Sequence, residues 1–158
     1  MRLATEVLIE RYQDNVYAAA YSVCRNAADA EDIVQDTFIQ YHTSDSEFDS
    51  EQHIRAWLLR VAVNKAKNVS RSFRRRASVP LEEYMATLPF EAPEDRDLFS
   101  HVMRLPARYR IVIHLFYYED YSVRDIAGIL HISEGNVRVR LTRGRKLLGA
   151  QLQQEGDA

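Results

Sequence analysis

The chain has 158 residues and a formal net charge of −2 at pH 7, from 21 Lys and Arg against 23 Asp and Glu. This length fits one domain or two very small ones, and 46% hydrophobic residues exclude wholesale disorder. A single cysteine excludes an internal disulfide and a cysteine-based zinc site. No membrane-length apolar stretch and no signal-peptide pattern are present, so we expect a soluble intracellular protein without a membrane span.

Helix-breaking residues divide the chain. Residues 1–79 contain neither Pro nor Gly, all four Pro lie between positions 80 and 106, and all five Gly come later. Helix interiors avoid both residue types, because Pro lacks the N–H and Gly costs backbone entropy. The pattern predicts an all-α protein with two small helical domains, residues 1–76 and 96–158, joined by a flexible, acidic linker over residues 77–95.

Charged residues are segregated along the same blocks. Residues 26–54 carry eight acids and no Lys or Arg, residues 55–81 carry eight bases and no acid, and residues 135–154 carry five bases and no acid. A single charged helix usually just presents a solvated face. Two basic blocks beside acidic ones favour two partners, because basic helices attract polyanions and acidic helices suit a protein. The near-zero net charge therefore does not exclude nucleic-acid binding.

The first block begins with an acidic amphipathic helix over residues 29–41, with apolar side chains at Val34, Phe38 and Tyr41. A polar, acidic loop follows over residues 43–53. Its one large apolar residue is Phe48. The sequence leaves two roles open for Phe48, since the ring can fold back into the core or stand exposed and stack on a base.

A basic helix follows the loop. Trp57 is expected in the core, and Asn64 and Asn68 share its face of the helix one turn apart. These amides can pair with base edges, but capping or plain surface roles fit the spacing equally well. The helix ends in the dense basic run 71–76, a candidate for phosphate binding.

The second block has the pattern of a helix-turn-helix. Ser122 with Asp125 matches a capping box that starts a short helix, and Ser133 can cap the next one after a turn at residues 131–133. In this motif the second helix enters the major groove. A helical hairpin with a basic surface is the alternative. The candidate contacts lie off the apolar seam of the second helix: Arg138, Arg140, Thr142, Arg143 and Arg145.

Three segments in this order, residues 29–38, 55–64 and 105–148, resemble the bacterial sigma-70 family, and specifically its small extracytoplasmic function (ECF) sigma factors. The likeness covers about residues 8–150, and the chain has room only for the second and fourth sigma domains. The resemblance implies a promoter-specificity factor that binds core RNA polymerase and promoter DNA. It implies no enzyme activity, catalytic residue, metal or cofactor. It also raises an anti-sigma factor as a partner.

The resemblance assigns roles to particular positions. A pocket that captures a flipped minus-ten base, and the helix that holds this element, would use Phe48, Asn64, Lys65, Asn68, Arg71, Arg74 and Arg75. The helix that reads the minus-thirty-five element would use Arg138, Val139, Arg140, Thr142 and Arg143. Docking on the clamp helices of the polymerase beta-prime subunit would involve Asp32, Ile33, Gln35, Asp36 and Phe38, while residues 108–116 would pack on the beta flap.

Two features depart from the family pattern. The loop around Phe48 is acidic, where many relatives place a basic residue after the Phe. Gly144 lies inside the recognition helix, where Gly costs about 1 kcal/mol relative to Ala, so we expect its last turns to fray. The main alternative function is an operator-binding regulator with a sensing or dimerising first block. A helical scaffold without a nucleic-acid role is the third reading.

Overall fold

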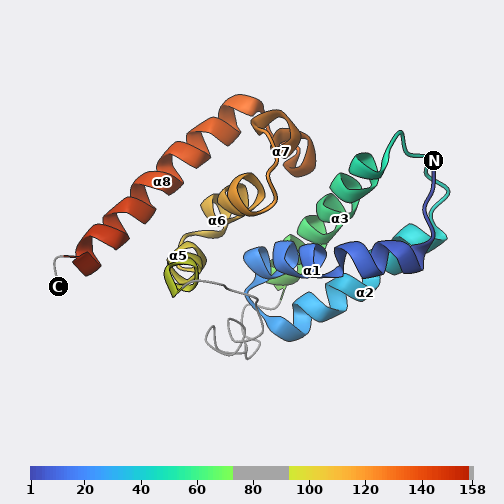
Figure 1. Cartoon of the computed structure of the whole chain (residues 1–158), viewed down its shortest axis with the longest axis horizontal. Coiled ribbons are helices and arrows are strands. Elements are labelled where there is room, and N and C mark those ends of the chain that lie inside the picture. The colour runs from blue at the N-terminus through green and yellow to red at the C-terminus, as the bar shows by residue number, and fades with distance from the viewer. Residues whose placement is uncertain (73–92, 157–158) are drawn as a thin grey trace. The chain divides into compact units, whose positions relative to one another are not determined.

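Helices make up all of the regular secondary structure in the part of the chain that the computed structural model describes, residues 1–72 and 93–156. The predicted all-α class is therefore confirmed. The chain divides into two units, Met1–Ser78 and Val79–Ala158 (Figure 1). Most of the predicted linker, residues 77–92, lies outside the described residues. No described helix is long and apolar enough to cross a bilayer.

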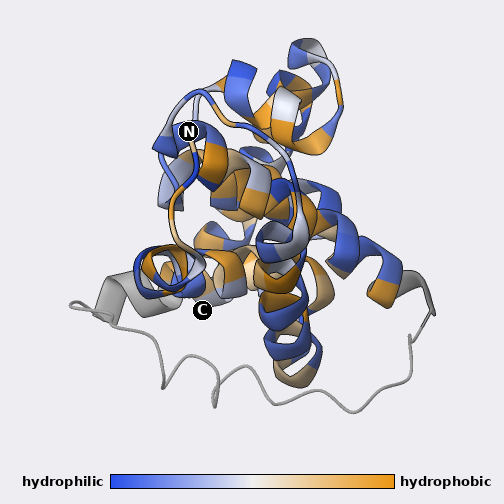
Figure 2. Ribbon diagram, turned by 90° about the vertical axis from the view of Figure 1, so that its right-hand side faces the viewer, coloured by the Kyte–Doolittle hydropathy of each residue, from blue (hydrophilic) through white to orange (hydrophobic). Residues whose placement is uncertain are grey.

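The first unit is built from three helices that pack on one another, α1 (Thr5–Cys24), α2 (Ala27–Thr43) and α3 (Glu51–Ser72). Each helix alternates polar and apolar segments, coloured blue and orange in Figure 2, and the apolar ones include the buried residues of the core. Leu8 of α1 and Leu58 of α3 are fully buried in the shared core. This burial, rather than intrinsic propensity, is the main stabilisation of such helices.

The reversal between α1 and α2 takes only two residues. Arg25 ends α1 in the left-handed conformation (φ 53°) and donates its N–H to Tyr21 O at 2.8 Å. Asn26 then caps α2, because its Oδ1 accepts the N–H of Asp29 at 2.9 Å. The two caps fix how the acidic helix leaves the core.

The second unit contains the predicted helix-turn-helix. Ser122 Oγ accepts the N–H of Asp125 at 3.1 Å and Ser133 Oγ accepts the N–H of Asn136 at 3.0 Å, so both predicted caps are confirmed. His131 provides the turn in the left-handed conformation. The elements are α5 (Pro93–Met103), α6 (Ala107–Ile113), the π-helical turn η1 (His114–Tyr118), α7 (Val123–Leu130) and α8 (Glu134–Gly156).

Gly144 is a site of close packing and not a point of fraying. Helix α8 continues past it to Gly156, which corrects the expectation from propensity alone. A Cβ added at Gly144 would lie 2.7 Å from Ile113 Cδ1 and 3.3 Å from Tyr109 Cβ. The missing side chain therefore lets α6 approach the backbone of α8, and burial of the contact offsets the helix-propensity cost.

Candidate nucleic-acid and protein interfaces

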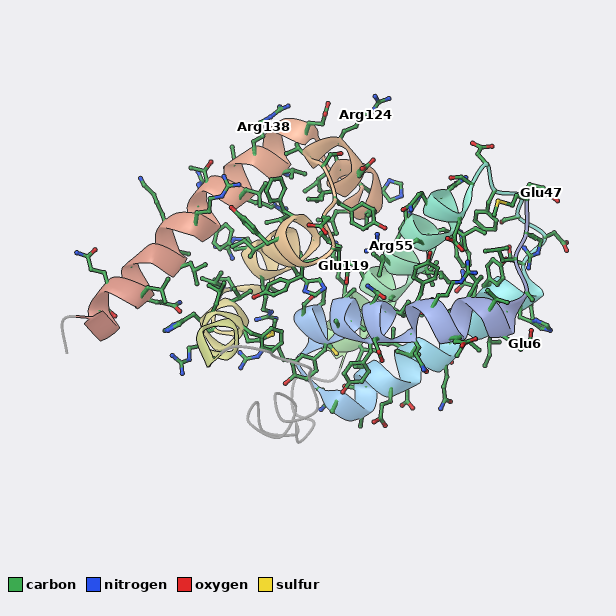
Figure 3. The ribbon with its side chains drawn as sticks, in the orientation of Figure 1. Glu6, Glu47, Arg55, Glu119, Arg124 and Arg138 are labelled. Carbon is green, nitrogen blue, oxygen red and sulfur yellow. The ribbon has the colours of Figure 1, made fainter. Side chains whose placement is uncertain are left out.

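The first turns of α8 present polar side chains to solvent and keep an apolar seam underneath. Val137 and Leu141 are buried against the rest of the unit. Arg138 points outward from this end of the motif, as does Arg124 of α7 (Figure 3). The predicted minus-thirty-five residues on the open surface are Arg138, Val139, Thr142 and Arg143, and Arg140 is half-buried.

Arg140 is oriented by a residue that the sequence analysis did not select. Its Nε donates to Asn136 Oδ1 at 3.2 Å, one turn back along α8. The sequence signal that could have identified Asn136 is the i, i+4 spacing between its amide and the Arg140 guanidinium. The bond to Asn136 uses only Nε, so the two terminal nitrogens of Arg140 point away from Asn136. Asn136 is itself exposed at the first turn of the helix.

Two aromatic side chains restrain arginines on either side of Gly144. The Tyr109 hydroxyl hydrogen-bonds with the guanidinium of Arg108, which lowers the pKa of Tyr109, and Arg143 lowers it further. On the other side, Arg145 Nε donates to Tyr117 Oη at 2.7 Å. Tyr117 was not chosen from sequence, because its bond to Arg145 joins elements 28 positions apart. Arg108 was expected within the beta-flap segment 108–116, not beside DNA.

Phe48 lies in the core of the first unit. Its side chain is 3% exposed, and its ring centroid lies 5.8 Å from both Tyr41 and Trp57. The core alternative is thus confirmed, and the exposed, base-stacking alternative is wrong. Its ring anchors the α2–α3 loop to the helices below. Trp57 is only half-buried, so part of this aromatic cluster reaches the surface.

The outer face of α3 carries the amides that the sequence analysis selected. Asn64 and Asn68 are both exposed, one turn apart, and Lys65 beside them is half-buried. Asn64 lies seven residues beyond Trp57, about 10 Å further along the helix axis. The side chains of Arg71, Arg74 and Arg75 lie outside the described residues.

The acidic helix α2 separates into an exposed and a buried face. Asp32, Gln35 and Asp36 are exposed, as a docking role requires. Ile33 and Phe38 are only 2% and 4% exposed, so they offer little surface of their own, although Phe38 lines the groove described below. Their burial instead fixes the orientation of the acidic face.

An apolar groove runs beside that acidic face. It has a volume of about 390 Å³, and α1 and α2 both line it. Ile39, 60% exposed, is the most open large apolar side chain at its edge. Sequence periodicity missed Ile39, because an isolated exposed apolar residue in a helix carries no pattern. The lining includes Ile9, Gln13, Val34, Phe38 and Ile39.

Among the described residues, no group of three or more His, Cys, Asp or Glu side chains could hold a metal ion. The chemistry on offer is recognition by charge and hydrogen bonding. A capped helix-turn-helix with an arginine-bearing recognition helix, in one chain with an acidic helix and an amide-bearing helix, defines a DNA-binding transcription protein.

Comparison with known proteins identifies the group within that class. The models of sigma-70 region 2 and sigma-70 region 4 match residues 8–78 and 101–148. The chain is 31% identical to the ECF RNA polymerase sigma-E factor of Haemophilus influenzae, over 95% of this chain and 88% of that protein. It is 29% identical to the ECF sigma factor SigW of Bacillus subtilis, over 92% and 87%. The chain belongs to the ECF sigma factors of the sigma-70 family.

A solved structure shares the fold. The sigma factor RpoE from Bartonella quintana, in complex with the anti-sigma factor NepR, superposes with a TM-score of 0.71 at 22% identity, covering 94% of this chain and 96% of that one. At this identity the likeness supports the fold alone.

Proposed function

We propose that this chain binds core RNA polymerase and directs it to promoters by holding two DNA elements, one with each unit. The exposed arginine face of α8, on a helix whose start is fixed by Ser133, carries the proposal. Membership of the ECF sigma factors supplies the second support. The polymerase performs the chemistry, and this chain supplies placement and strand opening in the cytoplasm.

The second unit reads the minus-thirty-five element. Arg138 at the open end of α8 is the natural donor to a guanine edge, because its fork can bond two acceptors at once. Arg143 with Arg108 lies further along, where guanidinium groups suit backbone phosphates. Arg124 of α7 suits a phosphate as well, since the first helix of the motif crosses the backbone. Phosphate contacts of this kind make the affinity depend on salt.

The first unit captures and holds the minus-ten element. Asn64 and Asn68 offer exposed amides that can pair with the edges of unstacked bases. Lys65 adds a cation on the same stretch of α3. Phe48 does not touch the base but supports the loop 44–50 from below. Capture of an unpaired base offsets its unstacking cost of a few kcal/mol.

Helix α2 docks on the clamp helices of the polymerase beta-prime subunit. Asp32, Gln35 and Asp36 supply exposed polar contacts, and Ile39 with the adjoining groove supplies the apolar area that a stable interface needs at its centre. The outer face of residues 108–116 packs on the beta flap. We also propose an anti-sigma partner, as NepR is for RpoE of Bartonella quintana.

A pull-down with core RNA polymerase distinguishes this function from an operator-binding regulator. Asp36→Arg is expected to weaken polymerase binding at least tenfold, because it inverts the charge of an exposed docking residue. The matched control is Asp14→Arg, which changes an exposed residue on α1. Asp14 lies about 140° around the helix from Ile9, the middle residue of the α1 row that lines the groove. Failure of the wild type to bind polymerase refutes the proposal.

Run-off transcription tests the DNA half. Arg138→Ala and Arg143→Ala are expected to lower initiation, whereas unchanged transcription would support a scaffold role. Asn64→Ala is expected to impair promoter opening more than polymerase binding. Equal losses in the two assays would contradict base capture by Asn64.

A further inference from the structure

The segment before α1 lies against the loop that joins α2 to α3 (Figure 1). Arg2 makes the connection with both arms of its guanidinium. Nη2 donates to Tyr41 O at 2.7 Å, and Nη1 donates to Ser46 O at 3.0 Å. One side chain thus bridges the last turn of α2 and the middle of the loop, 39 and 44 positions away in the sequence.

Both acceptors suit an arginine. The last carbonyls of a helix have no partner within the helix, and Tyr41 O, in the final turn of α2, accepts the N–H of the capping residue Ser44 at 3.2 Å besides Arg2. A cation at that end also interacts favourably with the helix dipole. The planar fork can bond two acceptors in a fixed relative geometry, which the single ammonium of a lysine cannot reproduce.

Tyr41 extends this connection to Phe48. Its hydroxyl donates to Leu3 O at 2.6 Å and accepts the N–H of Leu3 at 3.1 Å. The Arg2 guanidinium lies 4.4 Å from the centre of the Tyr41 ring, a cation–π contact. The fully buried ring packs in turn against Phe48, at 5.8 Å, and Trp57, at 6.1 Å. Residues 2–3 and the aromatic cluster therefore hold the loop from two sides.

The charges at this loop affect how it can approach DNA. The loop exposes Asp45, Glu47 and Asp49, and Glu47 projects at its outer edge (Figure 3). Three carboxylates repel a phosphate backbone. Beside the Met1 ammonium, which pairs with Glu47 at 3.2 Å, the exposed Arg2 brings a second cation to this loop from outside the loop's own sequence. Its position is fixed by the two carbonyls, so it serves both as a strap and as a local counter-charge.

We propose that Arg2 is a positioning residue for the minus-ten element: it fixes the loop 44–50 between the end of α2 and the Tyr41–Phe48–Trp57 cluster in the conformation that accepts the captured base. This inference rests on the proposed function of the first unit. It assigns to the segment before α1 a part in promoter opening.

The first test uses the free chain and needs no DNA. Trp57 is the one tryptophan in the sequence and touches the cluster, so its fluorescence reports on the loop anchor. Arg2→Ala is expected to shift Trp57 emission to longer wavelength and increase quenching by iodide, with unchanged far-UV circular dichroism. Arg25→Gln is the control, because Arg25 ends α1 about 30 Å along the helix axis from its start. An Arg2→Ala spectrum identical to wild type would overturn the strap.

The second test uses the holoenzyme formed with core polymerase. Wild-type holoenzyme is first used to select tightly bound sequences from a pool of fork-junction DNA whose single-stranded minus-ten segment is randomised. The most enriched fork sequence is then the probe for affinity measurements. Arg2→Ala is expected to lose about tenfold in affinity for that fork, the equivalent of one charged hydrogen bond. Its affinity for polymerase should stay within about twofold of wild type, since a charged hydrogen bond at the loop is not part of the docking face.

Arg2→Lys separates positioning from simple charge. It keeps the cation but not the fork, so it is expected to remain well below wild type. Wild-type affinity for Arg2→Lys or for Arg2→Ala would overturn the inference while leaving the proposed function intact. A wild-type holoenzyme that enriches no sequence would refute the proposed minus-ten role itself, and the inference with it.

Discussion

The contact at Gly144 makes a quantitative prediction about the recognition helix. A valine at this position must place its Cβ 2.7 Å from Ile113 Cδ1 and 3.3 Å from Tyr109 Cβ, and it adds two more carbons beyond. Overpacking of a well-packed site costs about 1–3 kcal/mol. Valine regains only a few tenths of a kcal/mol in helix propensity relative to glycine. We expect Gly144→Val to destabilise the second unit by about 1–3 kcal/mol.

Gly149 provides a matched control in the same helix. A Cβ there meets no heavy atom within 4 Å, so Gly149→Val should change stability by only a few tenths of a kcal/mol. Gly144→Ala is the graded case, because the far end of Ile113 can rotate away and about 1 kcal/mol of propensity opposes the remaining clash. We expect a stability close to wild type for that variant.

Thermal unfolding of the full chain, followed by two signals, measures the effect. Trp57 lies in the first unit, so its fluorescence follows that unit, while circular dichroism follows both. For a unit of this size, each kcal/mol lowers Tm by about 4–8 °C. Gly144→Val should lower the transition seen by dichroism and leave the Trp57 transition unchanged. Equal shifts for Gly144→Val and Gly149→Val would refute the close-approach argument.

Three further predictions address caps, charge and pH. His131→Gly should stabilise the second unit by about 0.5–1 kcal/mol in thermal melts, because the left-handed turn at φ 57° strains any residue with a Cβ, and His131→Ala should bring no such gain. Tyr117→Phe should weaken binding to a minus-thirty-five duplex about two- to fivefold, because the bond to Arg145 is lost. The salt dependence of the affinity should stay unchanged in Tyr117→Phe, whereas Arg145→Ala should reduce that salt dependence. Burial, with Glu31 nearby, raises the pKa of Tyr17 to about 12. The stability that the protonated phenol contributes is therefore complete below pH 10 and is lost as the pH rises through 12. In alkaline titrations, Tyr17→Phe should make the unfolding free energy depend less on pH over that range.

Local chemistry made the helix-turn-helix predictable. The hydroxyls of Ser122 and Ser133 accept N–H groups three residues ahead, and the apolar seam repeats within one helix, so a short window of sequence contains the whole signal. The period also placed Phe38 and Tyr41 on one stripe of α2. It chose Val34 for that stripe, but the structure buries Ile33 and leaves Val34 half-buried beside the groove. Because Phe38 and Tyr41 are buried as expected, the buried face is centred slightly to one side of the predicted stripe, with Val34 at its edge.

The fate of Phe48 could not be decided in the same way. Whether a loop aromatic is buried depends on partners brought by other elements, here Tyr41 from α2 and Trp57 from α3. The bond from Arg2 to Ser46 spans 44 positions and has no sequence period at all. Contacts of this range follow from how helices are packed, so sequence supplied the candidates for the minus-ten site but not their support.

The restraint of the basic residues on α8 explains how an almost neutral chain can present charge to DNA. Arg140 is held by the amide of Asn136, Arg145 by the phenol of Tyr117, and Arg143 lies by the phenol of Tyr109. A neutral acceptor orients a guanidinium without cancelling its charge. Ordering these side chains before binding reduces the entropy lost when they meet phosphate. No Asp or Glu lies between residues 135 and 154, so no acid on this stretch of α8 competes for these arginines.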